Sequence, residues 1–165
     1  MKKLFVMLVV ALVLSGCSAK ETFETIGDLW ATPVMANPAE IKLQLPEDVD
    51  ASVLDDPNGN KLYICDDFSV MVQTLPGGDM AQTVQTVTGY DKQKITMVKT
   101  EKDDTKVYSC AWSTAGESGD QICRAVILDD GVYHYAVTVM ADYTLATSLE
   151  DMWIPLLGSV TLSTD

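Results

Sequence analysis

Short apolar segments separated by clusters of Gly, Pro, Asn and Asp run along most of this chain. Residues 41–45, Ile-Lys-Leu-Gln-Leu, alternate apolar and polar side chains, which is the period of a strand with one buried face. Residues 55–60 and 129–131 are dense turn signals between such segments. A chain with this pattern is constrained to form an antiparallel sheet, because short strands joined by tight turns pair with their neighbours.

The pattern predicts nine strands. They cover residues 41–45, 51–54, 61–65, 68–75, 95–100, 106–113, 121–128, 132–140 and 160–162. Residues 106–113 and 121–128 are expected to pair across a loop at 114–119, and residues 129–131 to make the next hairpin turn. The last segment is short, so we expect it at an edge of the sheet.

Two helices are predicted within this series of strands. The first begins after Asp79, a good N-cap, and ends at Gly89, a common C-terminal residue. The second is expected to begin at Asp142 or Thr144, and Pro155 is expected to end or kink it. Its apolar stripe is formed by Leu145, Leu149, Met152 and Trp153.

The elements together predict the α+β class, with a central antiparallel sheet and helices packed on its faces. The strand that begins at residues 66–70, the helix end at 88–90, the strand at 133–138 and the closing segment 158–162 follow one another in a recognisable order. This order resembles the Mog1/PsbP-like α/β/α sandwich over about residues 40–163. The resemblance implies a fold only, because no functional residue of those families can be matched in this chain.

The N-terminus has the composition of an export signal. Two lysines at positions 2 and 3 precede eleven apolar residues, 4–14, a run too short to span about 30 Å of hydrocarbon. Leu-Ser-Gly-Cys at residues 14–17 then resembles the lipobox of bacterial lipoproteins. The resemblance implies that Cys17 receives a diacylglyceryl group and becomes the first mature residue. Two acyl chains hold a protein stably on a membrane, so we expect a lipid anchor on the extracytoplasmic face.

We therefore expect a signal peptide at residues 1–16, a lipidated N-terminus and tether at 17–24, and a single α+β domain at 25–165. The signal segment contains two of the eleven basic residues and none of the 24 acidic ones. The remaining chain thus carries a net charge near −15. Such a surface argues against binding to nucleic acid or to anionic lipid headgroups.

Three cysteines remain after lipidation, Cys65, Cys110 and Cys123, and an odd number leaves at least one unpaired. A symmetric hairpin that pairs Ser113 with Asp120 puts Cys110 directly opposite Cys123. An extracytoplasmic location then permits a disulfide between them. Burial of both as thiols is the alternative, and Cys65 could compete for either partner.

Candidate catalytic and metal-binding residues each have a structural explanation. Gly-Glu-Ser-Gly-Asp at residues 116–120 resembles the surround of a chymotrypsin-like nucleophile, but the only His follows Ser118, so a hairpin loop is expected. His134 lies in a predicted strand and has no second His to share a metal. The acidic pairs coincide with turns, and an irregular calcium site is the alternative for Asp55, Asp56, Asp66 and Asp67. Trp30, Trp112 and Trp153 could line a ligand groove, although core packing is expected for the last two.

No catalytic motif and no cofactor is predicted, so an enzyme is not expected. The favoured function is a non-catalytic, lipid-anchored envelope protein that offers a binding or scaffolding surface to an envelope protein partner. The alternative is a small-ligand or cation-binding lipoprotein with a pocket between sheet and helices. A deep apolar pocket with converging polar groups favours the second function, and a solid core with an exposed apolar patch favours the first.

Overall fold

The computed structural model describes residues 37–102, 105–116 and 119–163, which belong to one compact unit, Ala36–Asp165. Its strands are β1 (Glu40–Lys42), β2 (Ser52–Asp55), β3 (Lys61–Ile64), β4 (Phe68–Pro76), β5 (Met97–Lys102), β6 (Thr105–Gly116), β7 (Gly119–Asp129), β8 (Tyr133–Asp142) and β9 (Thr161–Ser163). Its α-helices are α2 (Met80–Thr88) and α3 (Glu150–Gly158), with short 3₁₀ turns η2 (Lys92–Lys94) and η3 (Tyr143–Leu145). Each predicted strand therefore has an observed counterpart.

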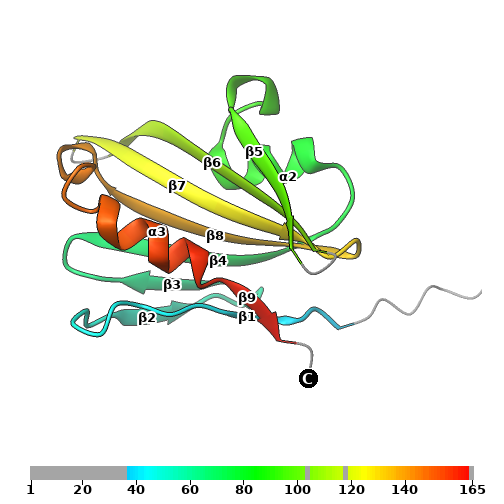
Figure 1. The fold of residues 1–165 in the computed structure, drawn as a ribbon, viewed down its shortest axis with the longest axis horizontal. Helices are drawn as coiled ribbons and strands as arrows, with labels where there is room; N and C mark the ends of the chain where they lie inside the picture. Colours follow the sequence, from blue (N-terminus) through cyan, green and yellow to red (C-terminus); the bar gives the residue numbers. More distant parts are fainter. Residues whose placement is uncertain (1–36, 103–104, 117–118, 164–165) are drawn as a thin grey trace, which may run out of the picture. The chain divides into compact units, whose positions relative to one another are not determined.

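Seven strands form one antiparallel sheet in the order β2-β3-β4-β8-β7-β6-β5 (Figure 1). The four strands β5 to β8 pair with their neighbours in sequence, and the pairings of β6 with β7 and of β7 with β8 are those that the turn signals predicted. β8 then pairs with β4 along nine residue pairs, from Phe68 opposite Ala141 to Pro76 opposite Tyr133. The sheet is thus assembled from two hairpin series that meet at β4 and β8.

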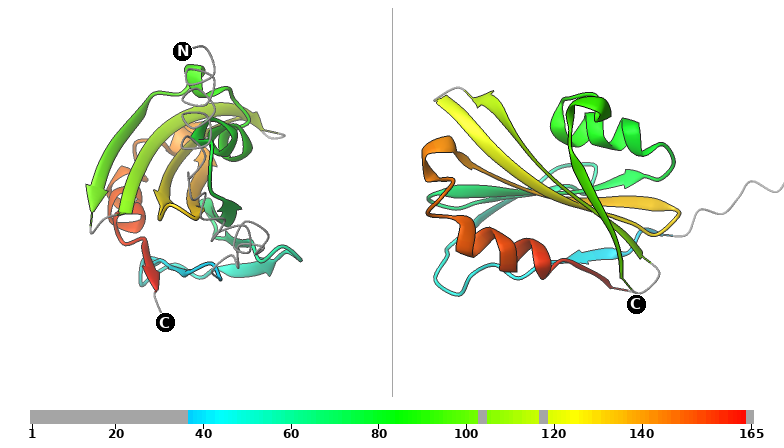
Figure 2. Two further views of the ribbon diagram at one scale, coloured as in Figure 1. Left: turned by 90° about the vertical axis from the view of Figure 1, so that its right-hand side faces the viewer. Right: turned by 45° about the horizontal axis from the view of Figure 1, so that its top comes forward.

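The two α-helices lie on opposite faces of this sheet (Figure 2). On one face, Trp153 and Leu156 of α3 pack against the side chains of β4, β7 and β8 that point to that side. On the other, Met80 and Val84 of α2 pack on Ile127 and Ala136. Strand residues alternate between the faces, so β7 and β8 are buried on both sides and contribute to both cores.

The predicted fold class is wrong. About half of the described residues are in strands and about a fifth are helical, so this part of the chain is a sheet-dominated fold and not an α+β sandwich with helical layers on its faces. The physical reason is that the helices are short. Each of the two α-helices in the described ranges has nine residues and extends only about 14 Å, which covers part of a face and forms no layer.

Helix α2 has the predicted boundaries because both of its ends are set by local chemistry. The Asp79 side chain accepts a hydrogen bond from the Ala81 N–H at 2.9 Å, and Gly89 closes the helix at φ +75°. The predicted start of the second helix, at Asp142 or Thr144, is too early. Asp142 instead caps the η3 turn, and α3 begins at Glu150 and contains Pro155.

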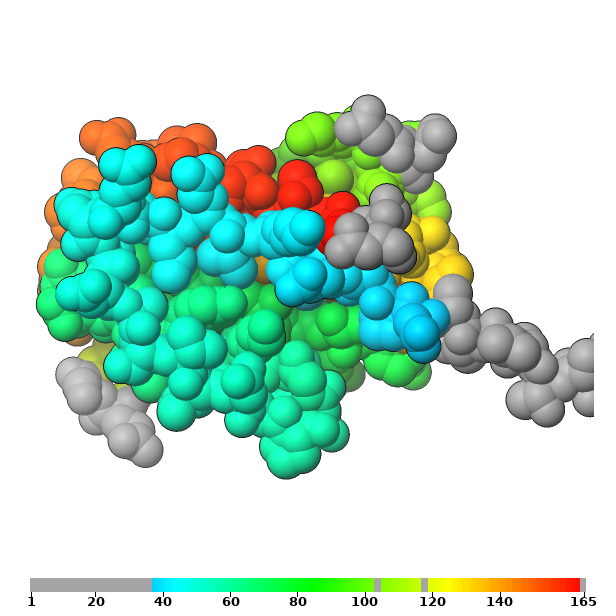
Figure 3. All heavy atoms as spheres, turned by 90° about the horizontal axis from the view of Figure 1, so that it is seen from below, coloured from blue at the N-terminus to red at the C-terminus, as the bar shows by residue number. Residues whose placement is uncertain are grey.

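Strand β9 is not at an edge of the main sheet. It pairs with β1 in a separate two-stranded sheet, with Ile41 opposite Leu162. The side chains of β1 and β9 pack under the α3 core, and residues 37–60 form much of the surface next to β9 (Figure 3). The end of α3 is therefore tied to the start of the described chain.

Candidate ligand-binding pocket

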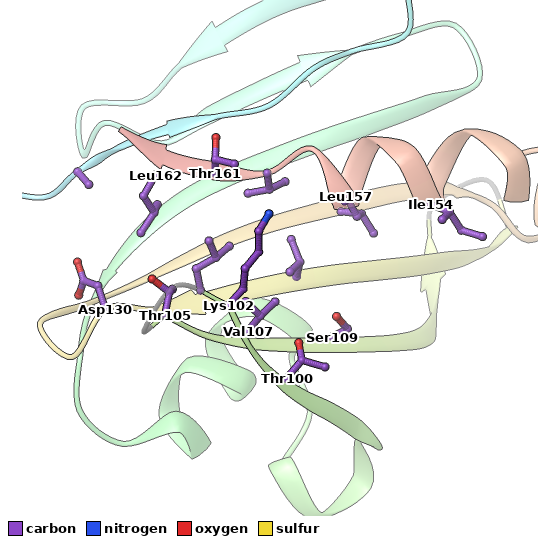
Figure 4. A pocket seen from close by; sticks show the side chains of 15 residues that line it. Thr100, Lys102, Thr105, Val107, Ser109, Asp130, Ile154, Leu157, Thr161 and Leu162 are labelled. Atoms are coloured by element: carbon purple, nitrogen blue, oxygen red, sulfur yellow. The ribbon is translucent and has the colours of Figure 1, made fainter. Parts of the chain in front are cut away.

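A cavity of about 680 Å³ lies on the α3 face, between the sheet and the segment that runs from α3 into β9 (Figure 4). The sheet contributes residues of β5, β6 and β7, and the other wall consists of α3, β9 and Ala39. The apolar lining residues are Val107, Val126, Leu128, Ile154, Leu157, Val160 and Leu162. Hydroxyl groups come from Thr100, Thr105, Ser109 and Thr161, and the two charged lining residues are Lys102 and Asp130.

The pocket follows from where α3 is anchored. Trp153 is fully buried and Leu156 nearly so, and both hold the helix over β4, β7 and β8. The neighbouring strands β6 and β5 extend beyond the helix, and on this face they line the hollow with Val107 and four polar residues, Thr100, Lys102, Thr105 and Ser109. Ile154, on the side of α3 toward the pocket, is 62% exposed. The helix therefore covers the middle of the face and leaves a hollow beside it.

Lys102 is the cationic residue of the pocket lining, and its side chain extends from β5 into the hollow (Figure 4). Thr105 lies directly opposite Lys102 in the β5–β6 register. Among the described residues Lys102 makes no hydrogen bond or ion pair. Within the described part of the chain, no group competes with an incoming ligand for this ammonium.

Asp130, the acidic lining residue, is already engaged by hydrogen bonds. Its Oδ1 accepts from the N–H groups of Val132 at 2.8 Å and Tyr133 at 2.7 Å, and its Oδ2 accepts from the Tyr135 hydroxyl at 2.8 Å. Partial burial raises the pKa of Asp130, but these hydrogen bonds outweigh it and keep the pKa below 3.8. Burial and the bond to Asp130 raise the pKa of Tyr135 to about 12, so the phenol stays protonated. Its oxygen also accepts from the Ala39 N–H at 3.0 Å.

A second hollow of about 610 Å³ lies near the start of α3, and its charged lining residues are all acidic. Its apolar lining includes Leu45, Phe68 and Leu156. Four carboxylates line it, those of Glu47, Asp48, Asp67 and Asp151. The described residues contain no group of three or more His, Cys, Asp or Glu that could hold a metal ion, so these carboxylates do not form a metal centre.

Comparison with known proteins gives a likeness of fold and no family. No protein-family model and no curated protein matches the sequence. A solved structure from Bacteroides thetaiotaomicron is similar over 76% of this chain at 8% identity, with a TM-score of 0.50, and this chain spans 46% of its length. LpqN of Mycobacterium tuberculosis, described as involved in cell envelope biogenesis, is similar over 78% of this chain and 87% of its own at 12% identity. Its TM-score is 0.47, which supports no conclusion about this chain.

The predicted cysteine pair lies in the expected hairpin but in a different register. Strands β6 and β7 pair up to Gly116 opposite Gly119, so Cys110 faces Ala125 and Cys123 faces Trp112. The prediction that the two cysteines are directly opposed is wrong. They share a face, because a two-residue shift preserves side-chain direction. Both are buried free thiols, and burial raises the pKa of each to about 11.

His134 is a packed strand histidine, as predicted. It is buried, and its Nδ1 is 2.6 Å from the Thr83 hydroxyl on α2. Its Nε2 lies 3.8 Å from Asp129 Oδ1, and Asp129 also pairs with Lys106 at 3.5 Å. The hydrogen-bond partner is 51 residues away in sequence, so periodicity could not identify it.

The alternative calcium site is excluded by topology. Asp55 and Asp56 lie at one end of β3, and Asp66 and Asp67 at the other, separated by about 13 Å of strand. Asp56 instead organises its own turn, because its carboxylate accepts from the N–H groups of Asn58 and Asn60 and from the Asn60 amide. These bonds, led by that of the Asn60 side chain, lower the pKa of Asp56.

Trp112 and Trp153 are core residues on opposite faces of the sheet, as expected, and do not line one groove. Cys17, Trp30 and Ser118 lie outside the described residues. Sequence reasoning did not find Lys102 or the hydroxyl groups around it. Thr100 and Lys102 do alternate with Lys99 and Glu101 in the sequence, but that alternation does not reveal which face has a hollow.

Both α-helices of the described ranges are too short to span a bilayer. A spanning helix needs about 20 apolar residues, and these have nine.

Proposed function

We propose that this chain is a non-catalytic, lipid-anchored protein of the bacterial cell envelope that binds a small, largely apolar ligand in the α3-face pocket. The observation that supports it best is the pocket itself. Its volume of about 680 Å³ is within the range of about 300–1,000 Å³ typical of small-molecule sites. Its lining of aliphatic side chains with a few polar groups has the composition of such sites.

Gly158 offers a direct way to test the pocket. It lines the cavity, and a Cβ built on it meets no atom within 4 Å. Gly158→Phe therefore adds a large side chain at the pocket wall without a backbone clash, and Gly158→Ala is the matched control. For the assay we would use the full chain with Cys17→Ser, which carries no acyl group, held in a fluorinated surfactant that dissolves hydrocarbon poorly.

We expect a neutral fluorescent apolar dye to bind the Cys17→Ser chain and its Gly158→Ala variant with similar affinity. Gly158→Phe should weaken binding by at least tenfold, since it removes the space for the ligand. Circular dichroism would show that both variants keep the fold. Equal dye binding by all three chains would contradict the proposal, and so would no binding by the parent chain.

The lipid anchor rests on the lipobox-like residues 14–17 and has its own test. Cys17→Ser should prevent acylation and leave unprocessed precursor, while Cys65→Ser should be acylated like the parent chain. Intact mass spectrometry of the protein from membranes measures both. A parent protein that carries no diacylglyceryl group on Cys17 would show that this part of the proposal is wrong.

A protein partner is the second candidate, favoured by the edge of the sheet at β2. All four residues of β2 are exposed, and Val53 and Leu54 are 47% and 56% exposed. An apolar edge strand offers unpaired backbone groups to an added strand. Crosslinking in native membranes should then capture a partner that is lost when Leu54→Lys is introduced and kept with Lys61→Gln.

A further inference from the structure

The charged and hydroxyl groups of the α3-face pocket restrict the class of ligand further than its apolar lining does. It has two charged lining residues, and only one of them is free to bind a ligand. Asp130 accepts three hydrogen bonds from Val132, Tyr133 and Tyr135, which occupy both carboxylate oxygens. Lys102 has no partner among the described residues. The two lining charges cancel in sum, but Lys102 is the one without a partner among the described residues, so its ammonium is the charged group that a ligand can pair with.

The position of Lys102 distinguishes it from the other lysines nearby. Side chains of β5 alternate between faces, so Thr100 and Lys102 line the pocket while Lys99 points to the α2 side. There Lys99 lies 5.9 Å from the centre of the Tyr108 ring. Lys106 of β6 pairs with Asp129. Of these three lysines, Lys102 alone faces the hollow.

Hydroxyl groups accompany the ammonium group. Thr105 is the residue directly opposite Lys102 across the β5–β6 pairing, and Thr161 lines the facing wall on β9. Hydroxyls and an ammonium are all donors to an anionic headgroup, and hydrogen bonds to an ionised group are about twice as strong as neutral ones. Beyond them, Val107, Leu128 and Leu157 give the hollow its apolar character.

The ammonium of Lys102 contrasts with the net charge of the whole chain. The chain has a formal net charge of −13, so its overall field repels anions. A free lysine beside an apolar hollow is the exception to that field, and it favours a ligand in which one anionic group is joined to a hydrocarbon part.

We propose that the pocket binds a single-chain amphiphile whose anionic headgroup pairs with Lys102 while its hydrocarbon chain lies against the aliphatic lining. This inference rests on the proposed ligand-binding function and adds the chemical class of the ligand. A carboxylate and a phosphate headgroup share the required chemistry, and the test below separates them.

The test uses the Cys17→Ser chain in fluorinated surfactant and four unbranched probes of fourteen carbons each: tetradecanoate, tetradecyl phosphate, tetradecanol and tetradecylamine. Each competes with the neutral fluorescent dye. The variants are Lys102→Gln, which removes the ammonium, Lys102→Arg, which keeps the charge, and Lys99→Gln, the matched control from the same strand and the opposite face.

We expect one or both anionic probes to bind at least tenfold more tightly than the alcohol and the amine. Lys102→Gln should weaken binding of the anionic probes about tenfold, equivalent to about 1.4 kcal/mol, and leave the affinity for the alcohol unchanged. Lys102→Arg and Lys99→Gln should keep the preference. The stronger of the two anions identifies the headgroup.

Two results would overturn the inference in distinguishable ways. If all four probes displace the dye equally and Lys102→Gln changes nothing, the ligand is not selected by its charge, but the proposed ligand-binding function stands. If neither dye nor probe binds the parent chain, the proposed function fails and the inference fails with it.

Discussion

The two faces of the seven-stranded sheet each carry one α-helix of nine residues, yet the helices cover their faces differently. After α2, residues 89–96 continue over the sheet before β5 begins, and Tyr90, Ile95 and Met97 pack around Cys110, Trp112 and Cys123. After α3, the chain leaves the sheet and β9 pairs with β1. The part of β5 and β6 on that side consequently lines a pocket.

The comparison shows that helix length does not decide whether a face is closed. What decides it is the path of the chain after the helix. On the α2 face, the connection to β5 returns across the sheet and adds apolar side chains to the core. On the α3 face, the connection joins a different sheet, so side chains of β5 and β6, four of them polar, are left to line a hollow. Substitutions that loosen one face or the other test this contrast.

The largest effect is expected at Trp153, which anchors α3. It is fully buried, and the Arg124 guanidinium lies 5.0 Å from the centre of its ring. Trp153→Ala should lower the free energy of unfolding by about 3–5 kcal/mol, because it removes a large core side chain and leaves a cavity. Urea denaturation measures this loss.

Trp153→Phe is the control, because it keeps an aromatic ring and removes an indole N–H that has no hydrogen-bond partner among the described residues. It should cost clearly less than Trp153→Ala. A loss below 1 kcal/mol for Trp153→Ala would mean that α3 is not held to the sheet by this residue.

A smaller effect is expected at Thr83, which attaches α2 to the sheet through His134. Thr83→Val keeps the shape of the side chain and removes the partner of a buried imidazole nitrogen 2.6 Å away. An unsatisfied buried polar group costs about 1–3 kcal/mol. Thermal unfolding should show this loss, while Thr86→Val on the exposed side of α2 should cost less. Equal costs at the two positions would contradict a structural role for the Thr83–His134 bond.

The pH dependence of stability should report on Asp130 at the α3-face pocket. Its pKa is lowered in the folded protein, so its ionised form stabilises the fold above the unfolded pKa of about 3.8, and this contribution is lost as the pH falls through the folded pKa. Asp130→Asn should cost about 1 kcal/mol at pH 7, a value reduced by the solvent exposure of the carboxylate.

Urea denaturation of both chains at pH 7 and at decreasing pH below 4 measures the difference. It should shrink as the pH falls, because the parent chain loses its ionised carboxylate. Asp120→Asn is a control for the loss of one negative charge. A difference independent of pH would show that the hydrogen bonds of Asp130 do not depend on its ionisation.

The rate of thiol modification should differ between cysteines on the two faces of the sheet. Cys65 is half-buried beside the α3 core, whereas Cys110 and Cys123 are buried on the α2 face with pKa values near 11. Since the thiolate is the reactive form, a thiol reagent at pH 8 should modify Cys65 first in the Cys17→Ser chain. The other two should react at the rate of unfolding, as peptide mass spectrometry would show. Rapid modification of Cys110 or Cys123 would mean that the α2 face opens.

Local signals were sufficient for much of the fold. The strands and the turn at 129–131 were predicted because alternation and turn residues act over a few positions. The limits of α2 were predicted because Asp79 and Gly89 satisfy backbone groups of their own helix. The register of β6 and β7 was not predicted, since the small residues at 114–116 indicated a loop but continue the strand pairing to Gly116.

By itself, the sequence determined that the chain forms an antiparallel sheet of short strands and where α2 begins and ends, because these depend on neighbouring residues. It also identified the lipobox-like residues 14–17, on which the proposed anchor rests. Only the tertiary structure decided which face is closed. The pocket exists because Trp153 holds α3 beside β5 and β6, and because β9 pairs with β1. Both are contacts between residues distant in sequence, so no local sequence pattern predicts that Lys102 lines the hollow.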